Sequence, residues 1–280
     1  MKLAQKIAVN YLRAKLNIVA LVSKRKAAAM AFELFCTPLK KPRKKKPSIF
    51  SSGEKLQLEI EGLTIYGNRW NFPQEKKCLI VHGFESTSYN FDRYISPLIK
   101  KGYEVLAFDA PAHGKSEGRQ ITLPLYVAAI KKVYEKCGPI HSYLAHSFGG
   151  LALIHFLETV PTAESKIVLI APATETTTAI DSFFRFLHLD NEIRKDFDAL
   201  IYKKGGKPAS DYSIRRAMHH IDAAVLWIHD EDDQMTPLTD ALKIKEDNHK
   251  RIEFMITKGF GHRRIYRENE VVKKILDFLA

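Results

Sequence analysis

Short apolar runs alternate with segments of helical periodicity from about residue 49 onward. Two stretches, 55–60 and 63–70, carry β-forming residues around Glu61-Gly62, which predicts an antiparallel pair. Six further runs are predicted strands: Cys78–Val81, Val105–Phe108, Tyr143–Ala145, Ile167–Ile170, Val225–Ile228 and Ile252–Ile256. Helices are predicted at about 90–101, 123–136, 148–159, 238–247 and 268–279. This alternation predicts an α/β fold, with a mostly parallel sheet covered by helices on both faces.

One interval breaks the alternation. About fifty residues separate the strand that ends near Ala171 from the strand that starts near Val225. We interpret the excess as an insertion over the sheet edge and as a candidate lid. Within it, residues 182–189 hold three phenylalanines and two leucines.

The first 47 residues have a different pattern. Their apolar residues recur at helical spacing, which predicts an amphipathic helix with the stripe Leu3, Ile7, Tyr11, Ala14, Ile18, Leu21 and Val22. A second apolar stretch covers 27–36, after which Pro38 and Pro42 exclude a helix and a run of Lys and Arg occupies 40–46. The sequence therefore divides into an N-terminal arm, 1–47, and a main domain, 48–280.

The net charge of the chain lies in the arm. The sequence has 44 Lys and Arg against 32 Asp and Glu, a net charge of +12. Residues 1–47 hold 13 of the basic residues and one acidic residue, Glu33, so the main domain is neutral. A neutral main domain and an arm with few aromatic residues disfavour nucleic-acid binding.

Other classes of protein are disfavoured by single features. Cys36, Cys78 and Cys137 form no CxxC pair, so we expect neither a disulfide framework nor a zinc site. No metal-binding spacing and no glycine-rich phosphate loop occurs, so we expect no metal and no cofactor. No run approaches the ~18 apolar residues that span a bilayer. The segment 16–23 offers no cleavage site for a signal peptide, so we expect a cytoplasmic protein.

The sharpest chemical signal is Ala145-His146-Ser147-Phe148-Gly149, at the junction of a predicted strand and helix. A serine hydroxyl is a weak nucleophile unless a turn presents it clear of the backbone beside a base. A strained strand-to-helix turn does this, and it needs small residues two positions before and after the serine, as here. The same pattern also fits a tight turn without a catalytic role.

Four further motifs follow predicted strands, at the edge where an open α/β sheet places its site. They are His82-Gly83-Phe84, the stretch 109–116, the acidic loop 229–237 and Gly259-Phe260-Gly261-His262. The order Ser147, Asp233, His262 is the one expected when the serine lies on such a turn.

Over roughly residues 54–280 these motifs resemble the α/β-hydrolase family. The resemblance rests on His-Gly-Phe at 82–84, Asp-x-Pro-x-His-Gly-x-Ser at 109–116, the turn at 145–149, the acidic loop ending in proline at 237, and Gly-His at 261–262. It implies an eight-stranded sheet whose first pair is antiparallel, with a cap formed by about 173–218. Two departures are Ala145 and Asp230, where the family usually has glycine.

The resemblance also implies a site. Ser147 would be the nucleophile, His262 the base and Asp233 the acid, with the backbone amides of Phe84 and Phe148 as oxyanion donors. The family spacing favours Asp233 over its neighbour at 232, and we interpret the unchosen acids at 230–232 as solvated loop charges.

The remaining histidines are expected to have other roles. His82 and His113 match positions that support the scaffold through hydrogen bonds. His146 is expected to point its ring away from the nucleophile.

Such a triad predicts a serine hydrolase that cleaves a carboxylic ester of a small-molecule acyl substrate through an acyl-enzyme intermediate. A serine nucleophile, rather than aspartate, disfavours dehalogenase or epoxide chemistry. Alternatives are a thioesterase, a C–C hydrolase or an acyltransferase on the same triad, and a non-catalytic binding protein on this fold.

Two segments each have two interpretations. The apolar face at 182–189 either packs on the core or lines an acyl pocket, with Phe184 and Phe186 as candidate substrate-binding residues. The arm either docks its stripe on the main domain or lies on an anionic membrane surface as a cationic amphipathic helix. Membrane association would suit a hydrolase of lipid-derived esters.

Overall fold

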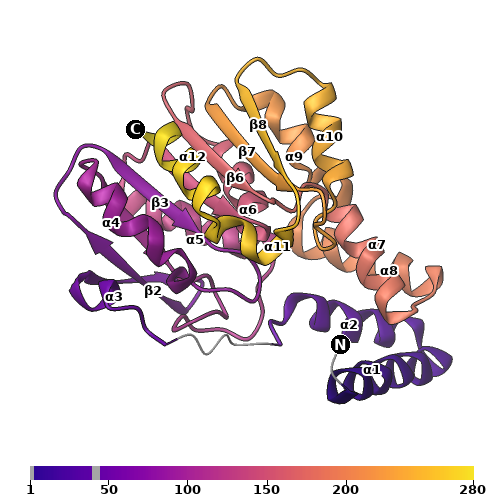
Figure 1. Ribbon diagram of the computed structural model, residues 1–280. Helices are drawn as coiled ribbons and strands as arrows, with labels where there is room; N and C mark the ends of the chain where they lie inside the picture. The colour runs from indigo at the N-terminus through magenta and orange to yellow at the C-terminus, as the bar shows by residue number, and fades with distance from the viewer. Residues whose placement is uncertain (1–2, 40–44) are drawn as a thin grey trace. The chain divides into compact units, whose positions relative to one another are not determined.

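The computed structural model describes residues 3–39 and 45–280, and it divides the chain into two compact units. The helical unit consists of Met1–Thr37 and Glu175–Ser213, and the sheet unit of Pro38–Thr174 and Ile214–Ala280 (Figure 1). The N-terminal helices thus share a unit with the insertion, although about 140 residues separate the two segments in the sequence. The basic run at 40–44 and the side chain of Leu3 lie outside the described residues.

The sheet unit contains one eight-stranded sheet, with the order β1-β2-β4-β3-β5-β6-β7-β8. The β1–β2 and β2–β4 pairs are antiparallel, and all other pairs are parallel. This confirms the mostly parallel sheet and its antiparallel first pair. The strands are β1 Glu54–Ile60, β2 Leu63–Trp70, β3 Lys77–Val81, β4 Glu104–Phe108, β5 Ser142–His146, β6 Lys166–Ile170, β7 Ala224–Asp230 and β8 Ile252–Thr257.

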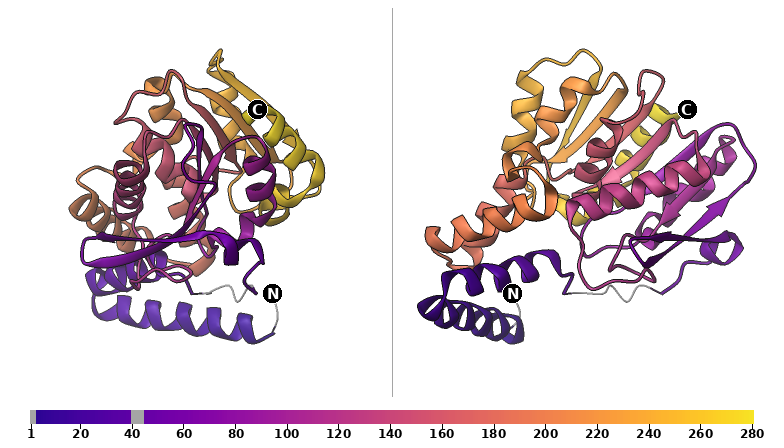
Figure 2. Two further views of the ribbon diagram at one scale, coloured as in Figure 1. Left: turned by 90° about the vertical axis from the view of Figure 1, so that its left-hand side faces the viewer. Right: turned by 180° about the vertical axis from the view of Figure 1, so that it is seen from behind.

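Helices cover both faces of this sheet (Figures 1 and 2). Helices α4 and α12 contact each other on one face, and α5 contacts α6 on the other. Every residue of β4 and of β5 is buried, because helices on both sides remove the polar face that an exposed strand would need. The helices of this unit are α3 Ile49–Ser52, α4 Asp92–Lys100, α5 Leu123–Cys137, α6 Phe148–Leu157, α9 Ile214–Ala217, α10 Leu238–Glu246, α11 Gly261–Arg264 and α12 Asn269–Leu279.

The helical unit contains α1 Leu3–Val22, α2 Lys24–Cys36, α7 Thr176–Leu187 and α8 Asn191–Gly205. Its interior is aromatic: the ring of Phe197 on α8 lies 5.6 Å from Phe32 on α2 and 5.1 Å from Phe184 on α7. Leu16 of α1 and Ala27, Ala28 and Ala31 of α2 are buried in the same cluster. The small side chains of α2 allow close packing against α8. This core therefore contains residues from both segments of the helical unit, the N-terminal helices and the insertion.

The two phenylalanines expected to bind substrate differ sharply in burial. Phe184 is 6% exposed and belongs to the core of the helical unit, whereas Phe186 is 46% exposed. The guanidinium of Arg13 on α1 lies 5.5 Å from the ring centre of Phe186 and donates a 2.9 Å hydrogen bond to its carbonyl. A substrate-binding role for either residue stays a prediction.

Among residues 3–39 and 45–280, no helix is both long and apolar enough to cross a membrane.

Because Phe184 is buried and Phe186 is half-exposed on the same helix, the two form a matched pair. Phe184→Ala should lower the free energy of unfolding by about 3–5 kcal/mol, through lost burial and the cavity it leaves. Phe186→Ala should cost less than about 1 kcal/mol, the size of an exposed cation–π contact. Urea unfolding followed by circular dichroism measures both. Equal losses would contradict the packing described for the helical unit.

Candidate active site

Ser147 occupies a strained turn between β5 and α6. Its backbone has φ 54° and ψ −128°, a conformation that costs about 1–3 kcal/mol for a residue with a side chain. Gly149 permits the turn, since a Cβ there would lie 2.3 Å from the carbonyl oxygen of His82. The sequence pattern of small residues around the serine therefore has a direct steric cause.

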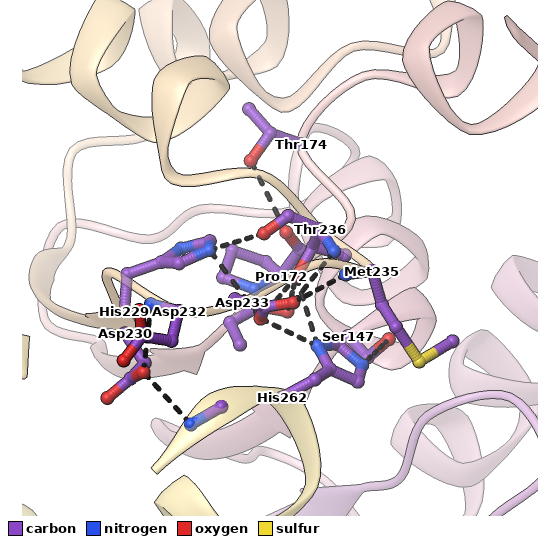
Figure 3. A network of polar contacts seen from close by, with 12 residues as sticks. Ser147, Pro172, Thr174, His229, Asp230, Asp232, Asp233, Met235, Thr236 and His262 are labelled. Atoms are coloured by element: carbon purple, nitrogen blue, oxygen red, sulfur yellow. Dashed lines mark hydrogen bonds and ion pairs between the residues drawn. The ribbon is translucent and has the colours of Figure 1, made fainter. Parts of the chain in front are cut away.

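Ser147, His262 and Asp233 form a continuous chain of hydrogen bonds (Figure 3). The His262 Nε2 atom lies 2.9 Å from Ser147 Oγ, and its Nδ1 atom lies 2.8 Å from Asp233 Oδ2. The serine follows β5, the aspartate follows β7, and the histidine is the second residue of α11, after β8. Parallel strands bring these carboxyl-terminal ends to one edge of the sheet. The structure thus brings together the three residues singled out from the sequence.

Asp233 is held as a carboxylate. Its Oδ1 atom accepts hydrogen bonds from the amides of Met235 (2.8 Å) and Thr236 (2.9 Å), and its Oδ2 atom accepts one from the Thr236 hydroxyl (2.9 Å). Burial alone would raise the pKa of this carboxyl. The hydrogen bond and charge of His262, together with the two amides, outweigh burial and lower the pKa to about 2.

Thr236 is a site residue that the sequence interpretation missed. Its hydroxyl oxygen lies 2.9 Å from Asp233 Oδ2, 3.1 Å from His262 Nδ1 and 3.1 Å from the carbonyl oxygen of Ala171. A threonine three residues after an aspartate is the local signal, because an aspartate accepts from the amide and hydroxyl at that position in a tight turn.

The interpretation of Asp230 as a solvated loop charge is wrong. Its side chain is fully buried, and it accepts hydrogen bonds from the Gly261 amide (2.9 Å), the Phe260 amide (3.1 Å) and the Thr257 hydroxyl (2.7 Å). Burial would raise the pKa of this carboxyl, but these donors outweigh it and lower the pKa. Asp230 thus ties the loop that carries Asp233 to the loop that carries His262.

The other two acids of this loop are exposed. Asp232 Oδ2 accepts from the Gly259 amide at 3.1 Å, and Glu231 lies 3.1 Å from the ammonium of Lys258. Neither contacts His262, which agrees with the choice of Asp233.

His146 lies directly against His262. The two ring centres are 4.7 Å apart, and His146 Nε2 is 2.9 Å from the carbonyl oxygen of His262. Burial, with the nearby His262 charge, lowers the pKa of His146 to about 3, so this ring is neutral and its Nε2–H donates to that carbonyl. Within the described residues, its buried Nδ1 atom has no hydrogen-bond partner. The sequence predicts only that this ring points away from the nucleophile, and it does not predict the contact with His262.

Three more buried histidines hold the surrounding backbone. His82 accepts from the Ala110 amide at Nε2 (2.9 Å), and His113 accepts from the Glu85 amide at Nε2 (3.0 Å), as expected for supports. His229 on β7 lies 2.7 Å, through Nε2, from the carbonyl oxygen of Thr236. Burial lowers the pKa of His82 and of His229, so both rings are neutral supports.

The two residues expected to supply oxyanion donors lie beside the serine. The rings of Phe84 and Phe148 are 6.3 Å apart in an edge-to-face arrangement. A Cβ on Gly83, which precedes Phe84, would lie 2.8 Å from Ser147 Cβ, so the backbone passes close to the serine. In the part of the chain that the structure describes, neither amide N–H has an acceptor. No group of three or more His, Cys, Asp or Glu suited to a metal ion occurs in that part either.

Part of the chain matches a known protein-family model. The family model Hydrolase_4, described as serine aminopeptidase S33, matches residues 73–199. The uncharacterized hydrolase YugF of Bacillus subtilis is 28% identical over 118 residues, 41% of this chain and 43% of its own length. The human serine hydrolase-like protein is 30% identical over 120 residues, 41% of this chain and 59% of its own length. Each match therefore covers less than two thirds of the relative.

Solved structures resemble this chain over most of its length. An esterase from Pyrococcus furiosus has a TM-score of 0.64 at 21% identity, covering 87% of this chain and 97% of that one. The thioesterase domain of the curacin biosynthetic pathway has a TM-score of 0.60 at 16% identity, covering 82% of this chain and 100% of that one. With the strand order, these likenesses define the class of fold: the chain has an α/β-hydrolase fold.

The lowered pKa of Asp233 predicts a pH dependence of stability. Its folded-state pKa of about 2 lies below the ordinary 3.8, so the carboxylate stabilises the fold above about pH 4 and loses this effect as the pH falls toward 2. The stability advantage of the wild type over Asp233→Asn should shrink by about 1 kcal/mol between pH 6 and pH 3. Urea unfolding at each pH measures it, with the exposed Asp232→Asn as control. An advantage that is constant with pH would contradict the assignment.

Proposed function

We propose that the protein is a serine hydrolase that cleaves a carboxylic ester of a small-molecule acyl substrate. The observation that carries the proposal is the hydrogen-bonded chain from Ser147 through His262 to Asp233, with the serine on a strained strand-to-helix turn. A turn with a purely structural role does not require an imidazole nitrogen 2.9 Å from the serine hydroxyl. Relatives named serine hydrolases and a similar fold in an esterase support the same reading.

In the proposed mechanism, Asp233 accepts the Nδ1–H of His262 and so fixes its tautomer. The unprotonated Nε2 atom then takes the proton of Ser147 as the hydroxyl oxygen attacks the carbonyl carbon. The histidine returns this proton to the leaving alcohol, and an acyl-enzyme remains. Water, deprotonated by the same histidine, releases the acid and restores the serine.

The negative charge that develops on the carbonyl oxygen needs donors aimed at it. The backbone N–H groups of Phe84 and Phe148 would supply them, since both flank Ser147 and have no acceptor within the described chain. Phe148 also begins α6, whose amino-terminal dipole favours negative charge. Such a donor typically contributes about 3 kcal/mol to transition-state stabilisation.

A thioester is the second candidate, since a thioesterase domain shares this fold. The same attack and the same oxyanion donors serve a thiolate leaving group. A screen over p-nitrophenyl esters of increasing chain length, acyl-CoA, monoacylglycerol and aminoacyl amides separates these classes. The amides are included because the matching family model carries an aminopeptidase description.

Replacing the nucleophile tests the proposal directly. Ser147→Ala and His262→Ala should each lower kcat by several orders of magnitude, and the double variant should be little worse, because triad members act as a unit. A fluorophosphonate probe should label the wild type at Ser147 only, as mass spectrometry of peptides would report. Labelling at another serine, or turnover retained in Ser147→Ala, overturns the assignment; no labelling at all would favour a non-catalytic protein.

His146 should act as a positioning residue, because it holds the backbone and ring of His262. His146→Phe keeps the buried ring but removes the hydrogen bond to the His262 carbonyl. We expect kcat to fall about 10- to 100-fold with little change in KM, because the base is no longer held in line with the serine. His146→Gln, which can donate from a similar position, should restore part of the loss.

The exposed His220→Phe is the control for the His146 variants, and melting temperatures accompany the kinetics. A fall in stability without a fall in kcat would leave His146 only a packing role.

A further inference from the structure

Helix α1 has two apolar faces, and the helical unit buries only one of them. The buried face is formed by Leu16 (2% exposed) and Ala20 (6%), with Val19 packed against the same core. The apolar stripe predicted from the sequence lies on the opposite face. Its members are exposed: Ile7 62%, Tyr11 64%, Ile18 64%, Leu21 86% and Val22 83%.

This stripe is continuous along the helix. Because an α-helix turns about 100° per residue, these five side chains and Ala14 fall within a sector of about 100°. Lys6 and Lys15 border the sector on its two sides, and both are exposed. Aligned aliphatic side chains that remain exposed to this degree mark an interaction surface rather than ordinary surface variation.

The N-terminal arm, residues 1–47, carries almost only positive charge. Up to Glu33, the chain has no acidic residue, and residues 1–47 carry the whole net charge of +12. Two basic side chains are engaged within the helical unit: Lys24 is paired with Asp190 at 2.6 Å, and Arg13 donates to Phe186. Lys6 and Lys15 are exposed beside the stripe on α1, and Arg25 is exposed at the start of α2.

We propose that the exposed face of α1 binds an anionic lipid surface, with the stripe entering the interface and the flanking Lys and Arg contacting the headgroups. Such a surface offers an apolar layer and negative charge together, which matches the two properties of this face. A nucleic acid would leave the aliphatic stripe uncovered. A second copy of the chain would bring two cationic arms together, and like charges oppose that contact.

Because the buried face of α1 belongs to the core of the helical unit, lipid binding must be tested with substitutions on the exposed face and not by deletion of the helix. Removing residues 1–37 would also remove Leu16 and Phe32 from the core shared with α7 and α8, so loss of binding would then be ambiguous. Substitutions on the exposed face leave that core intact. The full-length chain is therefore used throughout, and helical content and melting temperature confirm that each variant is folded.

Vesicle co-sedimentation measures the partition coefficient of the protein between water and lipid. Two kinds of vesicle are compared: purely zwitterionic vesicles, and vesicles that contain about 30% anionic phospholipid. Wild type should bind the anionic vesicles, and ~0.5 M salt should weaken binding. Ile18→Gln/Leu21→Gln removes apolar contact at constant charge and should lower the coefficient at least about tenfold. Lys6→Gln/Lys15→Gln should lower it about ten- to thirtyfold at low salt only.

Matched controls separate this face from the rest of the chain. Asn10→Gln/Asn17→Gln changes exposed residues of the same helix off the stripe and should bind as wild type does. Ser147→Ala should also bind normally, because the inference does not depend on the proposed hydrolase activity. Leu21→Trp should give a blue-shifted emission that brominated lipids quench, since the native Trp70 and Trp227 are buried in the sheet unit.

Three results would overturn the inference. They are equal sedimentation with anionic and zwitterionic vesicles, the same loss in the off-stripe control as in the stripe variant, and no change in Trp emission. Sedimentation velocity without lipid adds a fourth: a dimer that Ile18→Gln/Leu21→Gln dissociates would assign the stripe to a second copy instead.

Discussion

The strained backbone at Ser147 is the constraint on which the site depends. The neighbouring strand holds it in place: the Ser147 amide donates to the Ile170 carbonyl at 3.1 Å, and the Ser147 carbonyl accepts from the Ala173 amide at 3.1 Å. Gly149 lets α6 approach the carbonyl of His82, and so brings the loop after β3 beside Ser147. The free energy of folding of the sheet unit sustains this strain, and the result is a hydroxyl presented at the edge of a rigid sheet.

His262 and Asp233 are positioned by buried polar groups that surround them. Asp230 joins the loops after β7 and β8, Thr236 contacts both Asp233 and His262, and His146 holds the carbonyl of His262. Each of these groups is buried, so the hydrogen bonds act in a medium of low dielectric, where they are strong. His262, on the short helix α11, is thereby held by hydrogen bonds to groups on several other elements.

The core of the helical unit is formed by two segments that are far apart in the sequence. The amino-terminal helices supply Leu16, Phe32 and the alanines of α2, and the insertion supplies Phe184 and Phe197. The buried residues of both segments form a single cluster. Once the two have paired, α1 still has an exposed apolar face, and this face lies in the most basic part of the chain.

Local patterns in the sequence determined the strands and the main helices, and they singled out Ser147, Asp233 and His262, which the structure brings together. The reason is that strand periodicity, the small residues around Ser147 and the order of the motifs are properties of neighbouring residues. Tertiary structure alone decided the burial of Asp230, the contact of His146 with His262 and the role of Thr236, since each depends on loops that meet only when the sheet forms. It also decided which face of α1 is buried: both faces are apolar, and packing against α2 and α7 selects Leu16 and Ala20.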